Sequence, residues 1–280
     1  MEIYKGNKNM KKIRCVSDLL EELKYINTDS EVFYRGHANK NWELKPSIFR
    51  DEFKGREFEF YINIRNRNFL EFKSKKNIFD ELALMQHYSV PTRLLDWTSN
   101  PLVALYFATN SKIKEDGEIF IYTPKDVYYS DMVMTKLIAL LAVHSNAKYI
   151  DIEHYMSLKI DHLEHRTVKD FIKEDEKLAI EVVNSILMVK PKITNERLNL
   201  QSGCFTIHGN IIEGKLININ EPVKFNIYDE QIKRILVDKE YKEKIREELN
   251  IIGINESILF PEFENYAFYL REKLKNKVVD

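Results

Sequence analysis

Cysteine and net charge are both scarce in this chain, and each shortage excludes a class of protein. The 280 residues include only two cysteines, Cys15 and Cys204. Neither lies in a CxxC motif or in a Cys/His cluster with zinc-ligand spacing, which excludes a disulfide scaffold and a zinc site of that kind. We therefore expect two reduced thiols, as in a cytoplasmic protein, and no bound metal.

The charge and hydropathy patterns exclude further classes. A net charge of −1 gives the chain no general attraction to nucleic acid or to anionic membranes. No apolar run reaches the ~20 residues that a membrane-spanning helix needs. The opening stretch, MEIYKGNKNMKKIR, lacks the apolar core of a secretory signal. We expect a cytoplasmic protein without a membrane partner.

The first half of the chain predicts a mixture of helices and strands. Helical spacing predicts helices over 16–25, with Ser17 as N-cap, over 56–73 and over 78–88. Short strands are predicted over 31–35, ending at Gly36, and over 117–123, with a loop over 38–50. Asn100-Pro101 is a helix start, because proline suits the first helical position and Asn100 suits the cap. The helix that follows, LVALYFAT, is apolar on every side and is therefore expected to be buried.

The second half is predicted to begin with a helical block. Three helical stretches are expected, at 131–144, 151–171 and 176–184, followed by a strand in SILMVKP. The run RLNLQSGCFTIHG predicts a strand broken at Ser202-Gly203. A strand is expected at 225–227 and a charged helix at 229–248. Together these elements predict one α+β domain over residues 1–280, with the block at about 131–184 as a mainly helical insertion.

Polar residues crowd onto the ends of three predicted elements, and the first group is Tyr34-Arg35-Gly36-His37. An arginine at the end of a buried strand is costly unless it meets an anion or a carboxylate. Gly36 would allow a ligand to approach the backbone closely. The alternative is a structural ion pair of Arg35 with Asp96.

The second group runs from Gln86 to Pro101 and leads into the buried helix. A helix N-terminus presents free N–H groups and suits an anion. The hydroxyls of Thr98 and Ser99 either bind a phosphate or cap this helix. Trp97 and Tyr88 either stack on a planar ligand or fill the core.

Two histidine groups and one glutamine complete the candidates. His87 either titrates near neutrality or is structural. Gln201, at the predicted strand break, either points into a site or satisfies a turn. The histidines at 154, 162 and 165 have no HExxH-like companion pattern, so we interpret them as surface or helix-packing residues rather than metal ligands.

Four segments together resemble the FRG domain family, named for a Phe-Arg-Gly-type motif that is Tyr34-Arg35-Gly36 here. They are FYRGHANKNWELKPSIFR, ELALMQHYSVPTRLLDWTSNPLVALYFAT, GEIFIYTP and RLNLQSGCFTIHG. The resemblance runs from about residue 30 to residue 270 and includes a PEF element at Pro261. It does not cover the helical block.

A more distant resemblance is to ADP-ribosyltransferases of the Arg-Ser-Glu type. Arg35 resembles the arginine on their first strand. Residues 96–101, with Ala104 and Phe107-Ala108 after them, resemble their Ser-Thr-Ser element and its helix. The glutamate on their later strand is matched by Gln201, an amide that carries no charge, and Glu213 on the next predicted strand is the fallback.

These resemblances imply a split mixed sheet and NAD, or a related nucleotide, as substrate. They imply that Arg35 grips the pyrophosphate or ribose, that Tyr88 or Trp97 stacks on nicotinamide, and that Gln201 or Asp96 balances charge on the ribose. The implied catalytic residues are Arg35, Gln201 and Asp96, and the implied substrate-binding residues are Tyr34, Gly36, His37, His87, Tyr88, Thr92, Arg93, Trp97, Thr98, Ser99 and Asn100.

The activity implied is ADP-ribosyl transfer to a protein or nucleic acid, or NAD hydrolysis by water, in a bacterial toxin or phage-defence role. One alternative is a nucleotide or nucleic-acid binding module without turnover, favoured by the amide at Gln201. Another is a helix-rich interaction protein whose motifs only hold the fold.

Overall fold

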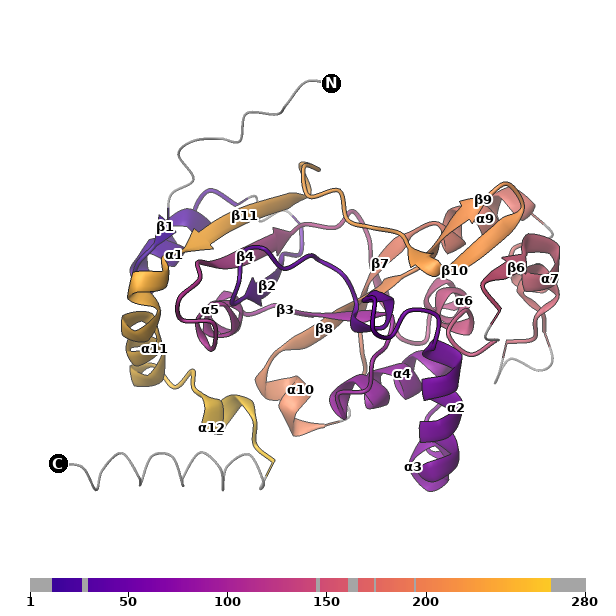
Figure 1. Ribbon diagram of the computed structural model, residues 1–280, viewed down its shortest axis with the longest axis horizontal. Coiled ribbons are helices and arrows are strands. Elements are labelled where there is room, and N and C mark those ends of the chain that lie inside the picture. Colours follow the sequence, from indigo (N-terminus) through magenta and orange to yellow (C-terminus); the bar gives the residue numbers. More distant parts are fainter. Residues whose placement is uncertain are drawn as a thin grey trace.

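The protein has an α+β fold built on one large mixed sheet and one small antiparallel sheet (Figure 1). The computed structural model describes residues 12–26, 30–144, 147–160, 166–173, 175–193 and 195–262. The large sheet has eight strands in the order β1-β11-β4-β2-β3-β8-β7-β5. Their bounds are β1 Lys12–Ile13, β11 Ile232–Val237, β4 Gly117–Tyr122, β2 Phe33–His37, β3 Leu94–Thr98, β8 Gly203–His208, β7 Ile186–Lys190 and β5 Val127–Tyr129.

The middle of the large sheet is nearly split. Strands β2 and β3 run antiparallel but share a single residue pair, Tyr34 with Thr98. By contrast, β2 pairs with β4 over five residues, and β3 pairs with β8 over five. Beyond Tyr34 and Thr98 the two central strands therefore leave backbone groups without a ladder partner, and those groups need side chains instead.

Helix α5, Pro101–Thr109, packs directly on strands β2 and β4, and two glycines make this possible. A Cβ added to Gly36 would lie 1.8 Å from the carbonyl oxygen of Ala104, and one added to Gly117 would lie 2.4 Å from that of Ala108. The absence of a side chain at Gly36 is therefore required by the packing of α5, and the approach of a ligand to its backbone stays a prediction. The space beside Gly36 is filled by the backbone of α5.

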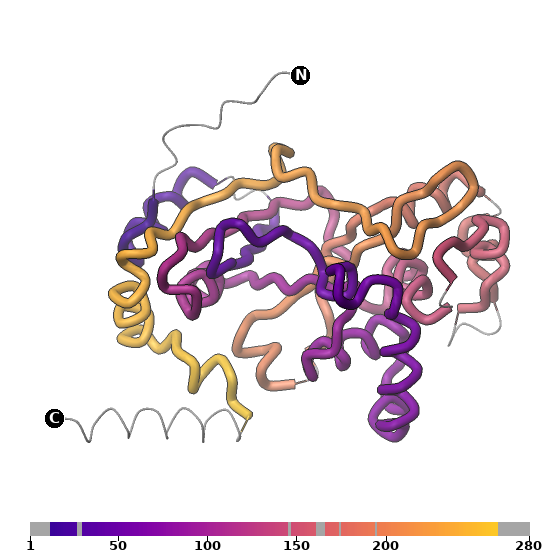
Figure 2. Tube along the Cα trace, viewed as in Figure 1, coloured from indigo at the N-terminus to yellow at the C-terminus, as the bar shows by residue number. Residues whose placement is uncertain are grey.

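The other helices cover the two halves of the sheet separately. Near the ends of the described chain lie α1 Val16–Leu23, the 3-10 helix η2 Lys239–Tyr241, α11 Lys242–Ile251 and α12 Glu256–Leu259. Figure 2 shows that the earliest and latest described segments lie together on this side, where β1 pairs with β11 in parallel. The other half carries the 3-10 helix η1 Ser47–Phe49, α2 Glu57–Arg67, α3 Phe69–Lys73, α4 Ile78–His87 and α6 Val133–Leu140.

The small sheet and the remaining helices extend this second half. Strands β6 Tyr149–Asp151, β10 Leu216–Pro222 and β9 Asn210–Glu213 form the antiparallel sheet, beside α7 Ile152–Ser157, α8 Val168–Phe171 and α9 Glu176–Val183. Side chains of α6 and α9 share one apolar core with Phe79, Leu82 and Leu94. This shared core supports the single-domain organisation, which remains a proposal.

Several predicted elements differ from the structure. Residues 196–200 form a helix, α10 Glu196–Leu200, because Asn195 caps it through the backbone N–H of Leu198. The charged run 229–248 contains strand β11 before α11, since Ile232, Ile235 and Val237 are drawn into the sheet beside β4. Residues 225–227 are not a strand.

Smaller differences concern caps and helix lengths. The residue at the N-cap of α1 is Cys15, and Ser17 does not cap it. The predicted helix over 151–171 is two short helices in the described part, and the helix over 56–73 is interrupted at Asn68. Positions 162 and 165 of the histidine cluster lie outside the described residues.

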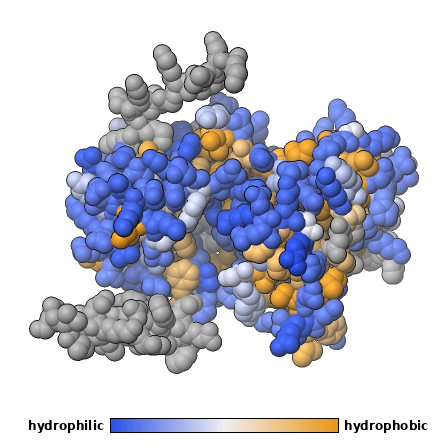
Figure 3. All heavy atoms as spheres, in the orientation of Figure 1, coloured by the Kyte–Doolittle hydropathy of each residue, from blue (hydrophilic) through white to orange (hydrophobic). Residues whose placement is uncertain are grey.

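The surface carries polar residues over most of the visible face (Figure 3). Apolar residues gather on this face around α2 and α3, where Phe69 and Leu70 are exposed. Within the described part of the chain, none of the helices has the length and apolar character to cross a bilayer. Both cysteines are free thiols, with Cys204 buried in the sheet.

Candidate functional site

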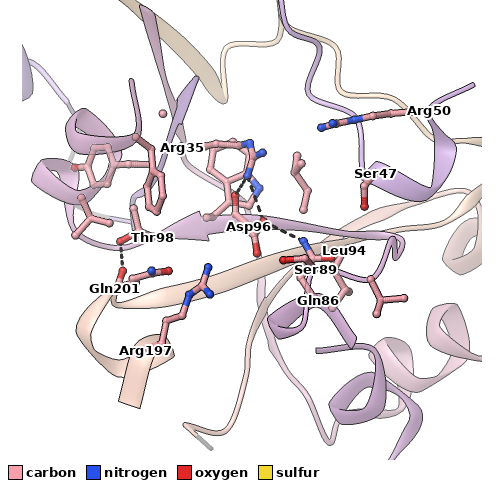
Figure 4. A pocket seen from close by; sticks show the side chains of 17 residues that line it. Arg35, Ser47, Arg50, Gln86, Ser89, Leu94, Asp96, Thr98, Arg197 and Gln201 are labelled. Atoms are coloured by element: carbon pink, nitrogen blue, oxygen red, sulfur yellow. Dashed lines mark hydrogen bonds and ion pairs between the residues drawn. The ribbon is translucent and has the colours of Figure 1, made fainter. Parts of the chain in front are cut away.

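A cavity of about 370 Å³ opens where β2 and β3 separate. Its walls come from β2, β3, α4, α5, α10 and the loop around η1, which are far apart in sequence (Figure 4). The lining residues are Tyr34, Arg35, Gly36, Ser47, Arg50, Gln86, Ser89, Val90, Leu94, Leu95, Asp96, Trp97, Thr98, Val103, Phe107, Arg197 and Gln201. The structure thus brings all three implied catalytic residues, Arg35, Asp96 and Gln201, to one cavity.

Arg35 crosses the gap between the two strands. Its Nη1 donates a hydrogen bond to the main-chain carbonyl of Asp96, which substitutes for the missing ladder bond. The same nitrogen lies 3.8 Å from the Asp96 carboxylate, and its side chain is 17% exposed. Arg35 therefore has a structural bond and still reaches the cavity.

His37 holds the other edge of the Arg35 guanidinium. Its Nε2 accepts a hydrogen bond of 2.9 Å from Arg35 Nε, so the ring proton is on Nδ1, which donates to the carbonyl of Trp42. Burial, and then the charge of Arg35, lower the pKa of His37 to about 3. His37 is consequently a neutral acceptor that positions Arg35, rather than an acid or base.

Asp96 presents its carboxylate to the cavity with 58% of the side chain exposed. Gln86 Nε2 donates to Asp96 Oδ2 at 3.0 Å, as Figure 4 shows. The buried Thr92 in turn donates its hydroxyl to Gln86 Oε1 at 2.7 Å. Thr92 was predicted to bind substrate, but its hydroxyl is enclosed and instead fixes the Gln86 amide against Asp96.

Arg50 and Arg197 add two more cations to the cavity wall. The side chain of Arg50 is exposed, and Figure 4 shows it reaching toward Arg35 from the opposite side. Arg197 lies over the ring of Phe260, 4.7 Å from its centroid, and 3.7 Å from a carboxylate oxygen of Glu262. Within the described residues, three guanidinium groups and one carboxylate line the cavity, so its wall is positively charged.

Thr98 and Gln201 line the cavity but are partly occupied by bonds within the protein. The Thr98 hydroxyl donates to the main-chain carbonyl of Gln201 at 2.7 Å and accepts from the N–H of Asn100. Gln201 follows α10 as its C-cap, and its Nε2 donates to the carbonyl of Leu259. Gln201 is therefore not at a strand break, and its amide oxygen is the group left for a ligand.

The predicted anion site at the start of α5 is already filled. Asn100 accepts a hydrogen bond from the N–H of Leu102 with its side chain, and the N–H of Ser99 donates to the carbonyl of Ser202. Neither Ser99 nor Asn100 lines the cavity. The helix start is capped by the protein itself, which leaves fewer N–H groups for a phosphate than the sequence indicates.

Two further predicted binding residues belong to the core. Trp97 is 3% exposed, its ring packs on Tyr122 and Phe225, and its Nε1 donates to the hydroxyl of Thr206. Arg93 is wholly buried. Arg93 does not line the cavity, and Trp97 lines it with little of its side chain exposed.

His87, Tyr88 and Tyr34 lie at the margins. His87 lines a smaller adjoining cavity of about 70 Å³, which also borders Asp96 and Gln201. Tyr88 is 57% exposed and donates its hydroxyl to Glu71. Tyr34 lines the main cavity, yet most of its ring is buried beside α5.

The predicted site residues did not include five polar residues of the cavity: Ser47, Arg50, Gln86, Ser89 and Arg197. Arginines were the useful signal, but Arg50 and Arg197 lie about half of the chain length apart in sequence and come to one cavity only in the fold. No group of three or more metal-ligating side chains occurs in the described ranges.

Comparison with known proteins gives one result. The FRG domain model matches residues 30–117, which contain Arg35, Arg50, Gln86 and Asp96. No curated protein and no solved structure matches the chain. The part of the chain that supplies β2, β3 and most of the polar cavity wall is therefore an FRG domain.

Proposed function

We propose that the cavity binds NAD or a related nucleotide, and that the protein is an ADP-ribosyltransferase or NAD glycohydrolase. The observation that carries this proposal is the charge arrangement of the cavity, with three arginines around a single carboxylate. Guanidinium groups bind phosphate oxygens in pairs of parallel hydrogen bonds, which favours a ligand with phosphate groups. The volume of about 370 Å³ lies in the range of small-molecule sites.

Asp96 is the group proposed to act on the ribose. Breaking the bond between nicotinamide and ribose leaves positive charge on the ribose ring, and a fixed carboxylate stabilises that charge. Gln86 and Arg35 hold Asp96 without covering it. The electron pair of the broken bond leaves with nicotinamide, and a water or an acceptor group adds to the ribose carbon and releases its proton to solvent.

Arg35 and Gln201 have positioning roles in this proposal. Arg35 is held by His37 and the Asp96 carbonyl, so its remaining N–H groups are fixed in direction toward the ligand. The Nε2 of Gln201 is bound to Leu259, which leaves its oxygen to accept a hydrogen bond from a ribose hydroxyl. An amide adds no charge, so Asp96 alone carries the electrostatic part.

The second candidate function is nucleotide binding without turnover. The amide of Gln201, where the resembling transferases have a glutamate, favours it. The two candidates agree on the ligand and differ only in what Asp96 does.

The test measures NAD binding by calorimetry and nicotinamide release by chromatography, with and without a cell lysate as acceptor. We expect Arg35→Ala to weaken binding about 10- to 100-fold, as loss of a charge-assisted contact does. Asp96→Asn keeps the shape and is expected to bind NAD while slowing release about 100-fold. The exposed Arg67→Ala on α2 is the matched arginine control.

Each outcome decides between the candidates. If the unaltered protein does not bind NAD, the proposal fails. Binding with no nicotinamide released under any condition leaves the non-catalytic module. Release at the unaltered rate from Asp96→Asn removes Asp96 from the mechanism.

A further inference from the structure

A second cavity, of about 730 Å³, adjoins the first on the far side of Arg35. The two cavities share four lining residues, Arg35, Gly36, Phe107 and Arg50. We call this shared rim the waist. A ligand in the first cavity that is longer than one nucleoside can therefore continue into the larger cavity by passing between Arg35 and Arg50.

The waist contains two arginines and no carboxylate of its own. Burial lowers the pKa of Arg35; the Asp96 carboxylate opposes this, and the charge of Arg50 lowers that pKa further and also lowers the pKa of His37. Two like charges are thus close enough to interact, whereas Asp96 lies on the first-cavity side. An anion held between the two guanidinium groups would remove this repulsion and accept hydrogen bonds from both.

Beyond the waist, the second cavity offers a platform for a ring. Trp42 lines it with 45% of the residue exposed, and Asn41 and Asn110 line it with amide groups. The carbonyl of Trp42 accepts from His37 Nδ1, while His37 Nε2 accepts from Arg35. One neutral histidine therefore fixes both the waist and the platform. Glu43 and Asp51 also line this cavity, at exposed positions.

We infer that Arg50 and Trp42 form a subsite for the second half of a dinucleotide. The pyrophosphate lies between Arg35 and Arg50, the ribose that reacts lies beside Asp96, and the purine of the other nucleoside stacks on Trp42. Stacking on an aromatic side chain is tolerant of the base and strong enough to contribute to affinity. This inference rests on the proposed function and adds the part of the ligand that the first cavity does not hold.

The chain offers a direct reporter for this subsite. It contains two tryptophans, Trp42 and Trp97, and Trp97 is buried in the core. Quenching of the exposed tryptophan by a stacked purine is therefore separable from the emission of Trp97. Titrations of fluorescence would use NAD, ADP-ribose and nicotinamide mononucleotide, which contains the reacting half only.

We expect NAD and ADP-ribose to quench the Trp42 emission, and nicotinamide mononucleotide to bind without quenching it. Trp42→Ala should weaken NAD and ADP-ribose binding about 10-fold and leave the mononucleotide unchanged, while Trp42→Phe retains most of the affinity because it keeps a stacking ring. Arg50→Ala should weaken the two pyrophosphate ligands about 10-fold.

Two results would overturn the inference while leaving the proposed function intact. One is equal affinity of NAD and nicotinamide mononucleotide. The other is an equal loss for both ligands in Trp42→Ala, which would mean that Trp42 supports the fold rather than the second half of the ligand. If neither ligand binds, the proposed function itself has failed.

Discussion

Arg35 lies in strand β2 and Arg93 directly precedes the neighbouring strand β3, yet their surroundings are opposite. Arg93 is wholly enclosed, and Glu57 accepts from its Nε and Nη2 and from its main-chain N–H. Its Nη1 is bound by Asn210 Oδ1 and by the carbonyl of His208. Arg35 has a neutral histidine, a carbonyl and a carboxylate that is 3.8 Å away.

This difference separates a structural arginine from one that is ready for a ligand. A buried charge requires a full set of partners, and Arg93 has one. Arg35, with Arg50 opposite it, keeps positive charge at a cavity wall. The arginine with the most hydrogen bonds is thus the one least suited to binding a substrate.

The largest effect is expected at Arg93. Arg93→Ala leaves Glu57 buried without its cation, which should destabilise the protein by about 3–5 kcal/mol. Arg35→Ala should cost only about 1–2 kcal/mol, since it removes hydrogen bonds at a partly open site. Chemical denaturation of the two variants measures both values.

A double variant sharpens this first test. Arg93→Met with Glu57→Leu removes both charges and should recover part of the loss, because apolar groups replace a buried pair at little cost. Equal losses for Arg93→Ala and Arg35→Ala would show that the two arginines are not of different kinds.

Acidification should lower the stability of the protein through two buried histidines, His37 beside Arg35 and His208 beside Arg93. Burial lowers the pKa of His37 to about 3 and that of His208 to about 4, from 6.5, so both are neutral in the folded protein. Unfolding then takes up protons below pH 6.5, and stability falls as the pH falls from 6.5 toward 4 and 3. At pH 5 the loss should be about 2 kcal/mol for each histidine.

His37→Gln separates the two contributions, because an amide replaces the neutral acceptor and does not titrate in this range. Its unfolding free energy should vary less steeply between pH 6.5 and 5, a window above the titration of ordinary carboxylates. An unchanged slope would mean that His37 is protonated in the folded protein.

The smallest effect is expected at Asn100. Removing the cap in Asn100→Ala should cost about 1 kcal/mol of stability and leave NAD binding unaltered. Asn100→Asp places a negative charge at the start of α5 and is a stricter test. If Asn100→Asp weakens NAD binding more than about 10-fold, an anion does bind at this helix start.

The sequence predicted the local elements of the fold better than the long-range ones. The helix at Pro101 and the strands at β2, β4 and β7 follow from caps, turns and alternation within a few residues. Strand β11 was missed because its charged alternate residues look like a helix surface until β4 lies beside it. The helix α10 was missed because Leu198 and Leu200 also fit a strand.

The prediction of the site residues has the same limit, since local patterns do not show which distant residues meet. Arg35, Asp96, Thr98 and Gln201 come to one cavity, as the motif segments indicated. Arg93 is buried away from the cavity, and Trp97 lines it with a ring that is mostly packed in the core. A motif does not reveal how much of a side chain is covered. Arg50 and Arg197 were not assigned, since only the fold shows that distant cations share a wall.

The last described residues have a consequence for synthesis of the protein. The Leu259 carbonyl binds Gln201, and the ring of Phe260 lies beneath Arg197 and beside Phe107. This wall of the cavity cannot form while these residues are still inside the ribosome during translation. The cavity can therefore be completed only after Leu259 and Phe260 have left the ribosome.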